Sequence, residues 1–193
     1  MKSTIEIPKM LHEVHGERAS RLDVLIPHGI ALLASIYLLM IPPGLDFGLT
    51  KSILLFILTY DLIGGVIANF TVGTSSFYAA SVSRRYKFIA LHILQPTLMW
   101  YLFKGESTLI IGLSLYIVAS ALVVNLVKQT QHQLTVSGAL VVIGLFLLQS
   151  YGASATFSLQ FLLTTFLLKL PLAWAVRWTE LSPKTNPVST NPH

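Results

Sequence analysis

The sequence contains no cysteine and few charged residues. The absence of cysteine from all 193 residues excludes disulfide bonds, thiolate catalysis and metal sites built on cysteine. Charged residues make up only 11% of the chain, whereas a typical soluble domain carries about 25%. Hydrophobic residues make up 53%. The chain therefore lacks the charged surface that a soluble domain of this length needs.

Sequence motifs of known membrane enzymes are also absent. The chain has no HExxH, HxxxH or GxSxG pattern, and Asp61 is the one carboxylate in its long apolar segments. A metal-dependent hydrolase needs about three ligands and would have to use His28, His92 and Asp61, whose expected depths in a membrane differ. The sequence consequently assigns no catalytic residue, no metal site and no cofactor.

The chain has six long apolar segments instead. A bilayer core of roughly 30 Å requires about 20 apolar residues in a helix. Because these runs are continuous and not alternating, they predict helices and not the strands of a membrane barrel. We expect an all-α, polytopic membrane protein with a bundle of six transmembrane helices within residues 24–178. The expected helices are Val24–Ile41, Leu49–Val72, Tyr86–Phe103, Leu109–Val127, Leu134–Tyr151 and Ala155–Trp178.

Polar segments flank the expected bundle on both sides. Residues 1–23 form an N-terminal cytoplasmic segment, in which residues 9–22 can fold as a short amphipathic helix on the membrane surface. Residues 179–193 predict a disordered cytoplasmic tail, since residues 182–193 hold three prolines and almost no large apolar side chain.

The distribution of lysine and arginine predicts the orientation, because short cytoplasmic loops carry an excess of both. If the N-terminus is cytoplasmic, Lys51 and Lys104 alone lie on the opposite side, and ten basic residues lie on the cytoplasmic side. We therefore expect a cell-membrane protein with both termini in the cytoplasm. The net charge of +5 is explained by contact with anionic lipid and requires no nucleic acid. The ten residues are Lys2, Lys9, Arg18, Arg21, Arg84, Arg85, Lys87, Lys128, Arg177 and Lys184.

Asp61 lies near the middle of the second expected helix, in the segment YDLIGGVIANF. An ionisable group in hydrocarbon costs at least about 2.5–3.5 kcal/mol, so it normally faces the bundle interior and has a partner. Asn69 follows near the same helical face, and Gly64 and Gly65 allow another helix to approach closely. We interpret Asp61 as a proton carrier, a cation ligand or a substrate anchor. The alternative is a structural carboxylate that holds two helices together.

His92 and Gln95 lie three residues apart in the third expected helix and therefore share a face. Pro96 follows them, leaves the backbone carbonyl of His92 without its helical donor and can kink the helix. We interpret His92 as a proton shuttle or a ligand. The alternative is a histidine that hydrogen-bonds an adjacent helix.

Depth along the helices predicts which side chains meet. At a rise of about 1.5 Å per residue, Asp61 lies roughly 18 Å from the cytoplasmic boundary, whereas Asn69 and His92 lie roughly 6–10 Å from it. We therefore expect His92 beside Asn69, and Asp61 beside Gln95 or Lys169. Lys169 lies roughly 13 Å from the same boundary. It either reaches Asp61 or extends its ammonium group to the lipid headgroups.

A polar cluster beside glycines and a proline is typical of transport or ligand binding. We expect the protein to bind or transport a small solute or an ion that the sequence does not identify. A homodimer is expected as well, since six spans are few for a transporter. The alternatives are an intramembrane enzyme that acts on a lipid or another apolar substrate, and a non-catalytic accessory or scaffold subunit. The candidate ligand-binding or proton-carrying residues are Asp61, Asn69, His92, Gln95, Lys169 and His28.

Overall fold

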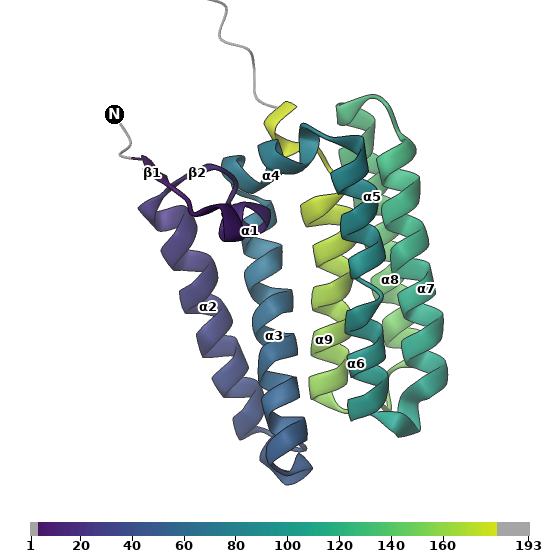
Figure 1. Cartoon of the computed structure of the whole chain (residues 1–193). Helices are drawn as coiled ribbons and strands as arrows, with labels where there is room; N and C mark the ends of the chain where they lie inside the picture. The colour runs from purple at the N-terminus through teal and green to yellow at the C-terminus, as the bar shows by residue number, and fades with distance from the viewer. Residues whose placement is uncertain (1–3, 181–193) are drawn as a thin grey trace, which may run out of the picture.

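The computed structural model describes residues 4–180, which form an almost entirely helical fold (Figure 1). Within these residues, five helices are long and apolar enough to cross a membrane. The expectation of an all-α protein with membrane-length helices is therefore confirmed, and residues 181–193 of the expected tail lie outside the described part. The five are α2 (Arg21–Met40), α3 (Leu49–Asn69), α7 (Ser107–Leu126), α8 (Thr130–Tyr151) and α9 (Phe157–Leu167), which the π-helix Leu168–Trp174 continues.

The third helix expected from the sequence is broken. In place of one helix over Tyr86–Phe103, the chain forms α5 (Val82–Leu91) and α6 (Leu94–Leu102), with the break at His92. Pro96 lies in the first turn of α6, where its missing N–H leaves no hydrogen bond unmade, so α6 starts anew after the break. Each part is too short to cross a bilayer alone. Figure 1 shows α5 and α6 following one another beside α7, so five of the six expected membrane-length helices are present among residues 4–180 and the third is not.

The N-terminal segment is a small hairpin and not the surface helix expected over residues 9–22. Gly16 adopts a φ of +73°, which ends α1 after one turn. Strand β1 pairs antiparallel with β2, so residues 18–20 are extended. The elements are β1 (Thr4–Glu6), a 3₁₀ turn (Lys9–Leu11), α1 (His12–His15) and β2 (Arg18–Ser20), which leads directly into α2.

Helix α1 is held closely against α4 (Val72–Ala79), a short helix after α3. A Cβ atom added at Gly16 would lie 2.2 Å from the backbone oxygen of Gly73, so these backbones touch only because both residues are glycine. The hydroxyl of Thr74 donates to the backbone carbonyl of Val14 at 2.5 Å. The hairpin thereby places α1 over the end of α3 (Figure 1).

Helix α3 joins two parts of the bundle. On one side it packs along α2, and on the other it contacts α6, α9 and the π-helix, which pack with α7 and α8. The buried core lies mainly on this second side and includes Leu58 and Leu62 of α3 with Phe166 of α9, while α2 adds Leu38. The outer faces of α2 and α8 expose large apolar side chains such as Leu33 and Phe146. Such surfaces are suited to lipid and not to water.

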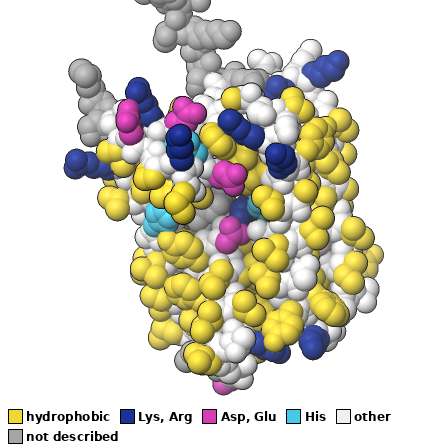
Figure 2. All heavy atoms as spheres, viewed as in Figure 1, with side chains coloured by type: hydrophobic (Ala, Val, Ile, Leu, Met, Phe, Trp, Pro, Cys, Tyr) yellow, Lys and Arg dark blue, Asp and Glu magenta, His cyan; other side chains and the backbone are white. Residues whose placement is uncertain are grey.

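Basic residues are distributed unequally between the two ends of the bundle. Most of them lie at the end that carries α1, α4 and the start of α5 (Figures 1 and 2). At the opposite end, Lys51 and Lys104 lie over the ring of Tyr101, with their ammonium groups 5.6 and 5.7 Å from its centroid. The structure consequently has one strongly basic end, as the sequence predicts.

The remaining short elements are 3₁₀ helices at the two ends of the bundle. Leu45–Phe47 and Lys104–Glu106 lie at the end opposite the basic one, and Trp178–Glu180 follows the π-helix at the basic end.

Candidate functional site

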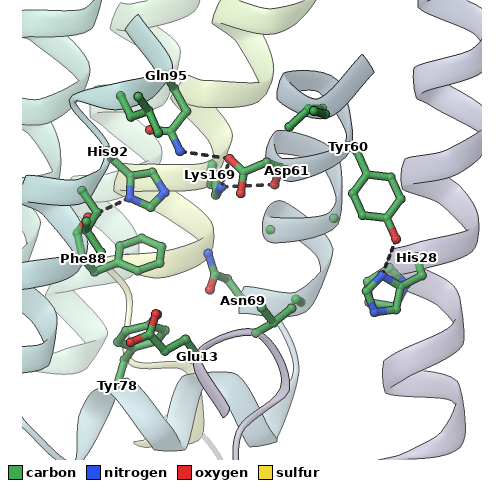
Figure 3. Close-up of a pocket in the computed structure, with 18 of the residues that line it drawn as sticks. Glu13, His28, Tyr60, Asp61, Asn69, Tyr78, Phe88, His92, Gln95 and Lys169 are labelled. Atoms are coloured by element: carbon green, nitrogen blue, oxygen red, sulfur yellow. Dashed lines mark hydrogen bonds and ion pairs between the residues drawn. The ribbon is translucent and has the colours of Figure 1, made fainter. Parts of the chain in front are cut away.

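Asp61 and Lys169 form an ion pair in the middle of the bundle (Figure 3). The Nζ atom of Lys169 donates to the carboxylate oxygen Oδ2 of Asp61 at 2.8 Å and to the Asp61 backbone carbonyl at 3.1 Å. The Nε2 atom of Gln95 donates to the same Oδ2 at 2.9 Å. The prediction that Asp61 meets Gln95 or Lys169 is confirmed for both partners, and Lys169 does not extend to the headgroups.

The two charged partners differ in exposure. The side chain of Lys169 is 3% exposed, whereas that of Asp61 is 48% exposed. Among residues 4–180, no side chain donates a hydrogen bond to Oδ1, the second carboxylate oxygen of Asp61. A buried ammonium group without a counterion is strongly destabilising. Asp61 therefore neutralises Lys169 with one oxygen and keeps the other available.

Gly65 creates the space for the lysine head. A Cβ atom at Gly65 would lie 2.4 Å from Cε and 2.7 Å from Nζ of Lys169, which is closer than atoms can approach. The neighbouring Gly64 faces α2 instead, where a Cβ would be 3.5 Å from that of Ala31, an ordinary contact. The two glycines thus have separate roles: Gly65 admits the lysine, and Gly64 lies against the next helix.

Lys169 extends from a local widening of the last helix. Pro171 lacks an N–H and cannot complete the regular hydrogen bond to the preceding turn. In the same segment, the backbone N–H of Ala175 bonds the carbonyl of Leu170, five residues back, at 3.0 Å. Single π-helical turns of this kind often occur at functional sites.

His92 lies at the break between α5 and α6 and is 5% exposed. Its Nδ1 is 2.7 Å from the backbone oxygen of Phe88. Because a carbonyl only accepts, Nδ1 carries the proton, and Nε2 of the neutral ring is an acceptor. Nε2 is buried and has no hydrogen-bond partner. Figure 3 shows it directed toward the pair of Asp61 and Lys169.

A cavity of about 510 Å³ lies beside these residues, between the α2–α3 hairpin and the α5–α6 segment. It reaches from Gln95 and Asp61 in the middle of the bundle to Glu13 of α1 at the basic end. Figure 2 shows acidic, basic and histidine side chains in a hollow on the side of the molecule, surrounded by apolar ones. Ile57, Leu91 and Leu94 line the cavity and are more than half exposed. The cavity therefore opens sideways, between apolar side chains.

Asn69 lines the same cavity from the end of α3. It is 4% exposed, and its Nδ2 atom has no hydrogen-bond partner. The contact expected between Asn69 and His92 is not formed as a hydrogen bond, but both residues face the cavity (Figure 3). Three buried polar atoms of cavity-lining residues, Nδ2 of Asn69, Nε2 of His92 and Oε1 of Gln95, thus have no hydrogen-bond partner among the described residues. Buried polar groups in this state are uncommon in folded proteins.

His28 belongs to a separate chain of hydrogen bonds at the α2 side of the cavity. Its Nδ1 lies 2.7 Å from the hydroxyl of Tyr60, and its Nε2 lies 2.9 Å from Nε2 of His15 in α1. Facing Nε2 atoms can share only one proton, so one ring donates and the other accepts. The structure therefore places five of the six candidate residues in one cluster and His28 in an adjacent network that ties α1 to α2 and α3.

The His15–His28 contact predicts a pH dependence of stability. Burial, together with the facing His28 ring, lowers the pKa of His15. As the pH falls, the unfolded chain, in which histidine has its ordinary pKa of about 6.5, takes up the proton first. Stability is therefore complete above about pH 6.5 and decreases as the pH falls below it. Thermal unfolding between pH 8 and pH 5 should show this decrease in the wild type and a weaker one in His15→Asn.

The exposed His132 at the start of α8 provides the matched control. His132→Asn should retain the wild-type pH profile of the unfolding temperature. If His15→Asn and the wild type lose stability to the same extent between pH 6.5 and 5, the role assigned to the histidine pair is wrong.

Sequence reasoning missed several residues that line the cavity. Glu13 is recognised in the sequence only as part of the polar face of a surface helix, and it lies at the cavity end beside Tyr78 (Figure 3). Phe88 packs against His92, with ring centroids 4.0 Å apart and the ring planes tilted by 33°. Nothing in the local sequence separates Tyr78 and Phe88 from ordinary core aromatics, because their position depends on how α4 and α5 pack.

The chain matches no protein-family model, no curated protein and no solved structure. Within residues 4–180, no three His, Asp or Glu side chains are grouped so that they could hold a metal ion. The fold and the site together define the class: a helical protein with five membrane-length helices and a laterally open cavity, in which a buried lysine is paired with a half-exposed aspartate.

Proposed function

We propose that the chain is an integral protein of the cell membrane and that its N- and C-termini both lie on the cytoplasmic side. Five membrane-length helices together with one crossing by the α5–α6 segment would make an even number of crossings, which supports a location of both termini on the same side. The unequal distribution of lysine and arginine supports a cytoplasmic location for the end that carries α1 and α4. The broken segment is compatible with a bilayer because backbone groups freed inside a protein can face a cavity and not lipid.

We propose further that the cavity binds a small solute and that the protein transports it. One observation carries this proposal: a half-exposed carboxylate, held by a buried lysine, faces a cavity of about 510 Å³ that contains unpartnered polar atoms. A purely structural carboxylate would be enclosed between helices. Pockets of roughly 300–1,000 Å³ with a few convergent polar groups are typical of small-molecule sites.

The architecture supports movement of the solute. The α2–α3 hairpin and the α5–α6 segment form the two walls of the cavity, and the second wall is interrupted at His92. Broken helices with polar groups near the membrane midplane are characteristic of transporters. A homodimer remains our expectation for the functional unit.

The proposal is tested by flux into proteoliposomes. The purified protein is reconstituted, and uptake is measured for a panel of labelled solutes: an amino acid, a hexose, a carboxylate and an aromatic alkylamine. We expect uptake of at least one solute class above that of empty vesicles, and a reduction of at least about tenfold in Asp61→Asn, because a carboxylate forms charge-assisted hydrogen bonds that an amide cannot.

Two further variants make the flux result interpretable. Asp61→Asn combined with Lys169→Met removes both charges and leaves no unpaired ammonium group, so it should also lose flux while remaining folded. Asp46→Asn changes an exposed carboxylate at the opposite end of the bundle and should retain flux. Flux that is unchanged when Asp61 is replaced, or no protein-dependent flux of any solute, would contradict the proposed function.

A further inference from the structure

The charge of the cavity is net negative. Its lining contains one lysine and two carboxylates, Lys169, Asp61 and Glu13, which leave one negative formal charge when the histidines are neutral. Lys169 is already neutralised by Asp61. The Glu13 side chain is exposed at the cavity end and takes part in no ion pair within residues 4–180. The excess negative charge is that of Glu13, so the cavity end attracts a cation and repels an anion.

Two hydrogen-bond acceptors near the ion pair have no donor among the described residues. Oδ1 of Asp61 accepts no hydrogen bond from the described residues, and Nε2 of His92 is a buried acceptor without a donor. Both face the cavity from opposite walls (Figure 3). Gln95 and Lys169 hold Oδ2 of the carboxylate and thereby leave Oδ1 turned to the open space. A ligand group that carries N–H donors as well as a positive charge satisfies both acceptors.

The walls of the cavity are mainly aromatic and aliphatic. Phe56, Tyr60, Tyr78 and Phe88 line it, and aromatic faces attract organic cations. The space is much larger than a bare metal ion requires, and its apolar walls supply no ring of oxygen ligands. The sideways opening between exposed apolar side chains is suited to a molecule that partitions into the bilayer.

Resting on the proposed function, we propose that the ligand is a lipophilic primary or secondary amine in its protonated form. Its ammonium group binds between Oδ1 of Asp61 and Nε2 of His92, and its apolar body lies along Phe88 and Phe56 toward the opening. The ion pair of Asp61 with Lys169 stays intact, since releasing Lys169 would leave a buried charge unpaired. Glu13 attracts the cation to the end of the cavity and adds no direct contact.

The proposal is tested with four probes that share one apolar body: phenylbutylamine, phenylbutyl-trimethylammonium, phenylbutanol and phenylbutyrate. Equilibrium binding is measured to the protein in lipid nanodiscs, and binding to empty nanodiscs is subtracted. The amine should bind at least about tenfold more tightly than the alcohol and the carboxylate, because charge-assisted hydrogen bonds contribute on that scale. The trimethylammonium probe has the charge but no N–H donor and should bind several-fold more weakly than the amine.

Variants separate the site from general membrane partitioning. Asp61→Asn should weaken the amine about tenfold and leave the alcohol unchanged. Glu13→Gln, at an exposed position, should slow association of the amine at low salt by several-fold, while Asp46→Asn should have no effect. An amine that binds no more tightly than the other three probes overturns the proposal. If phenylbutanol or phenylbutyrate binds in an Asp61-dependent manner, the assignment of an amine ligand is wrong and the proposed transport function stands. If, in addition, no solute shows flux, the amine assignment and the transport function are both wrong.

Discussion

Replacing Asp61 by asparagine should lower the free energy of unfolding by about 3 kcal/mol. Removing one member of a buried ion pair typically costs about 3–5 kcal/mol, because the other charge stays buried and unpaired. The lower end applies here, since Asp61 itself is 48% exposed and Lys169 retains its bond to the Asp61 backbone carbonyl. Unfolding of the purified protein in mild detergent, followed by tryptophan fluorescence, measures this loss.

The double variant Asp61→Asn/Lys169→Met separates a charge effect from a packing effect. Methionine fills a similar volume without a charge, so the double variant should recover most of the stability lost in Asp61→Asn. Lys87→Met, at an exposed position in α5, controls for the loss of a basic residue. A double variant that is no more stable than Asp61→Asn would show that the ion pair does not account for the loss.

Substituting alanine at two adjacent glycines should have opposite effects. In Gly65→Ala, the new Cβ occupies the position 2.4 Å from Cε of Lys169 and forces the ammonium group away from Asp61. Overpacking of a filled site typically costs about 1–3 kcal/mol. In Gly64→Ala, the nearest side-chain atom is the Cβ of Ala31 at 3.5 Å, so the helix gains about 0.5–1 kcal/mol from the better helix former. Thermal unfolding of the two variants measures the difference.

Gly65→Ala should also lose amine binding, because Lys169 no longer holds the Asp61 carboxylate in place. Gly64→Ala should retain it, since Gly64 faces Ala31 and Pro27 of α2. Equal unfolding temperatures and equal amine binding in Gly65→Ala and Gly64→Ala would mean that the ammonium group of Lys169 does not need the space beside Gly65. The packing role of Gly65 would then be wrong.

The sequence by itself determined the five membrane-length helices and the unequal charge of the two ends, and it limited the partners of Asp61 to two candidates. Long apolar runs define membrane-length helices because their length and continuity are properties of the chain alone. The depth of a residue also follows from its place along a helix, at about 1.5 Å per residue. This is why Gln95 or Lys169 was expected beside Asp61, although depth left open whether Lys169 reaches Asp61 or the headgroups; the structure shows both contacts.

Other features depended on contacts between distant segments. The proline that follows His92 indicates a kink, but whether the helix bends or breaks depends on how α5 and α6 pack on their neighbours. Helix α1 ends at Gly16, where the backbone of Gly73, 57 residues further along the chain, lies against it. Local amphipathicity predicts a longer helix there because it contains no information about that contact.

The cavity itself was decided only by tertiary structure. Depth predicts which residues lie at the same level of the bundle, but it does not give the rotation of a helix about its axis or the distance between helices. Those two quantities bring Asp61 and His92 to facing walls, turn His28 toward His15, and place Glu13 at the cavity end. They arise from side-chain packing among helices that are far apart in sequence, which no local pattern encodes.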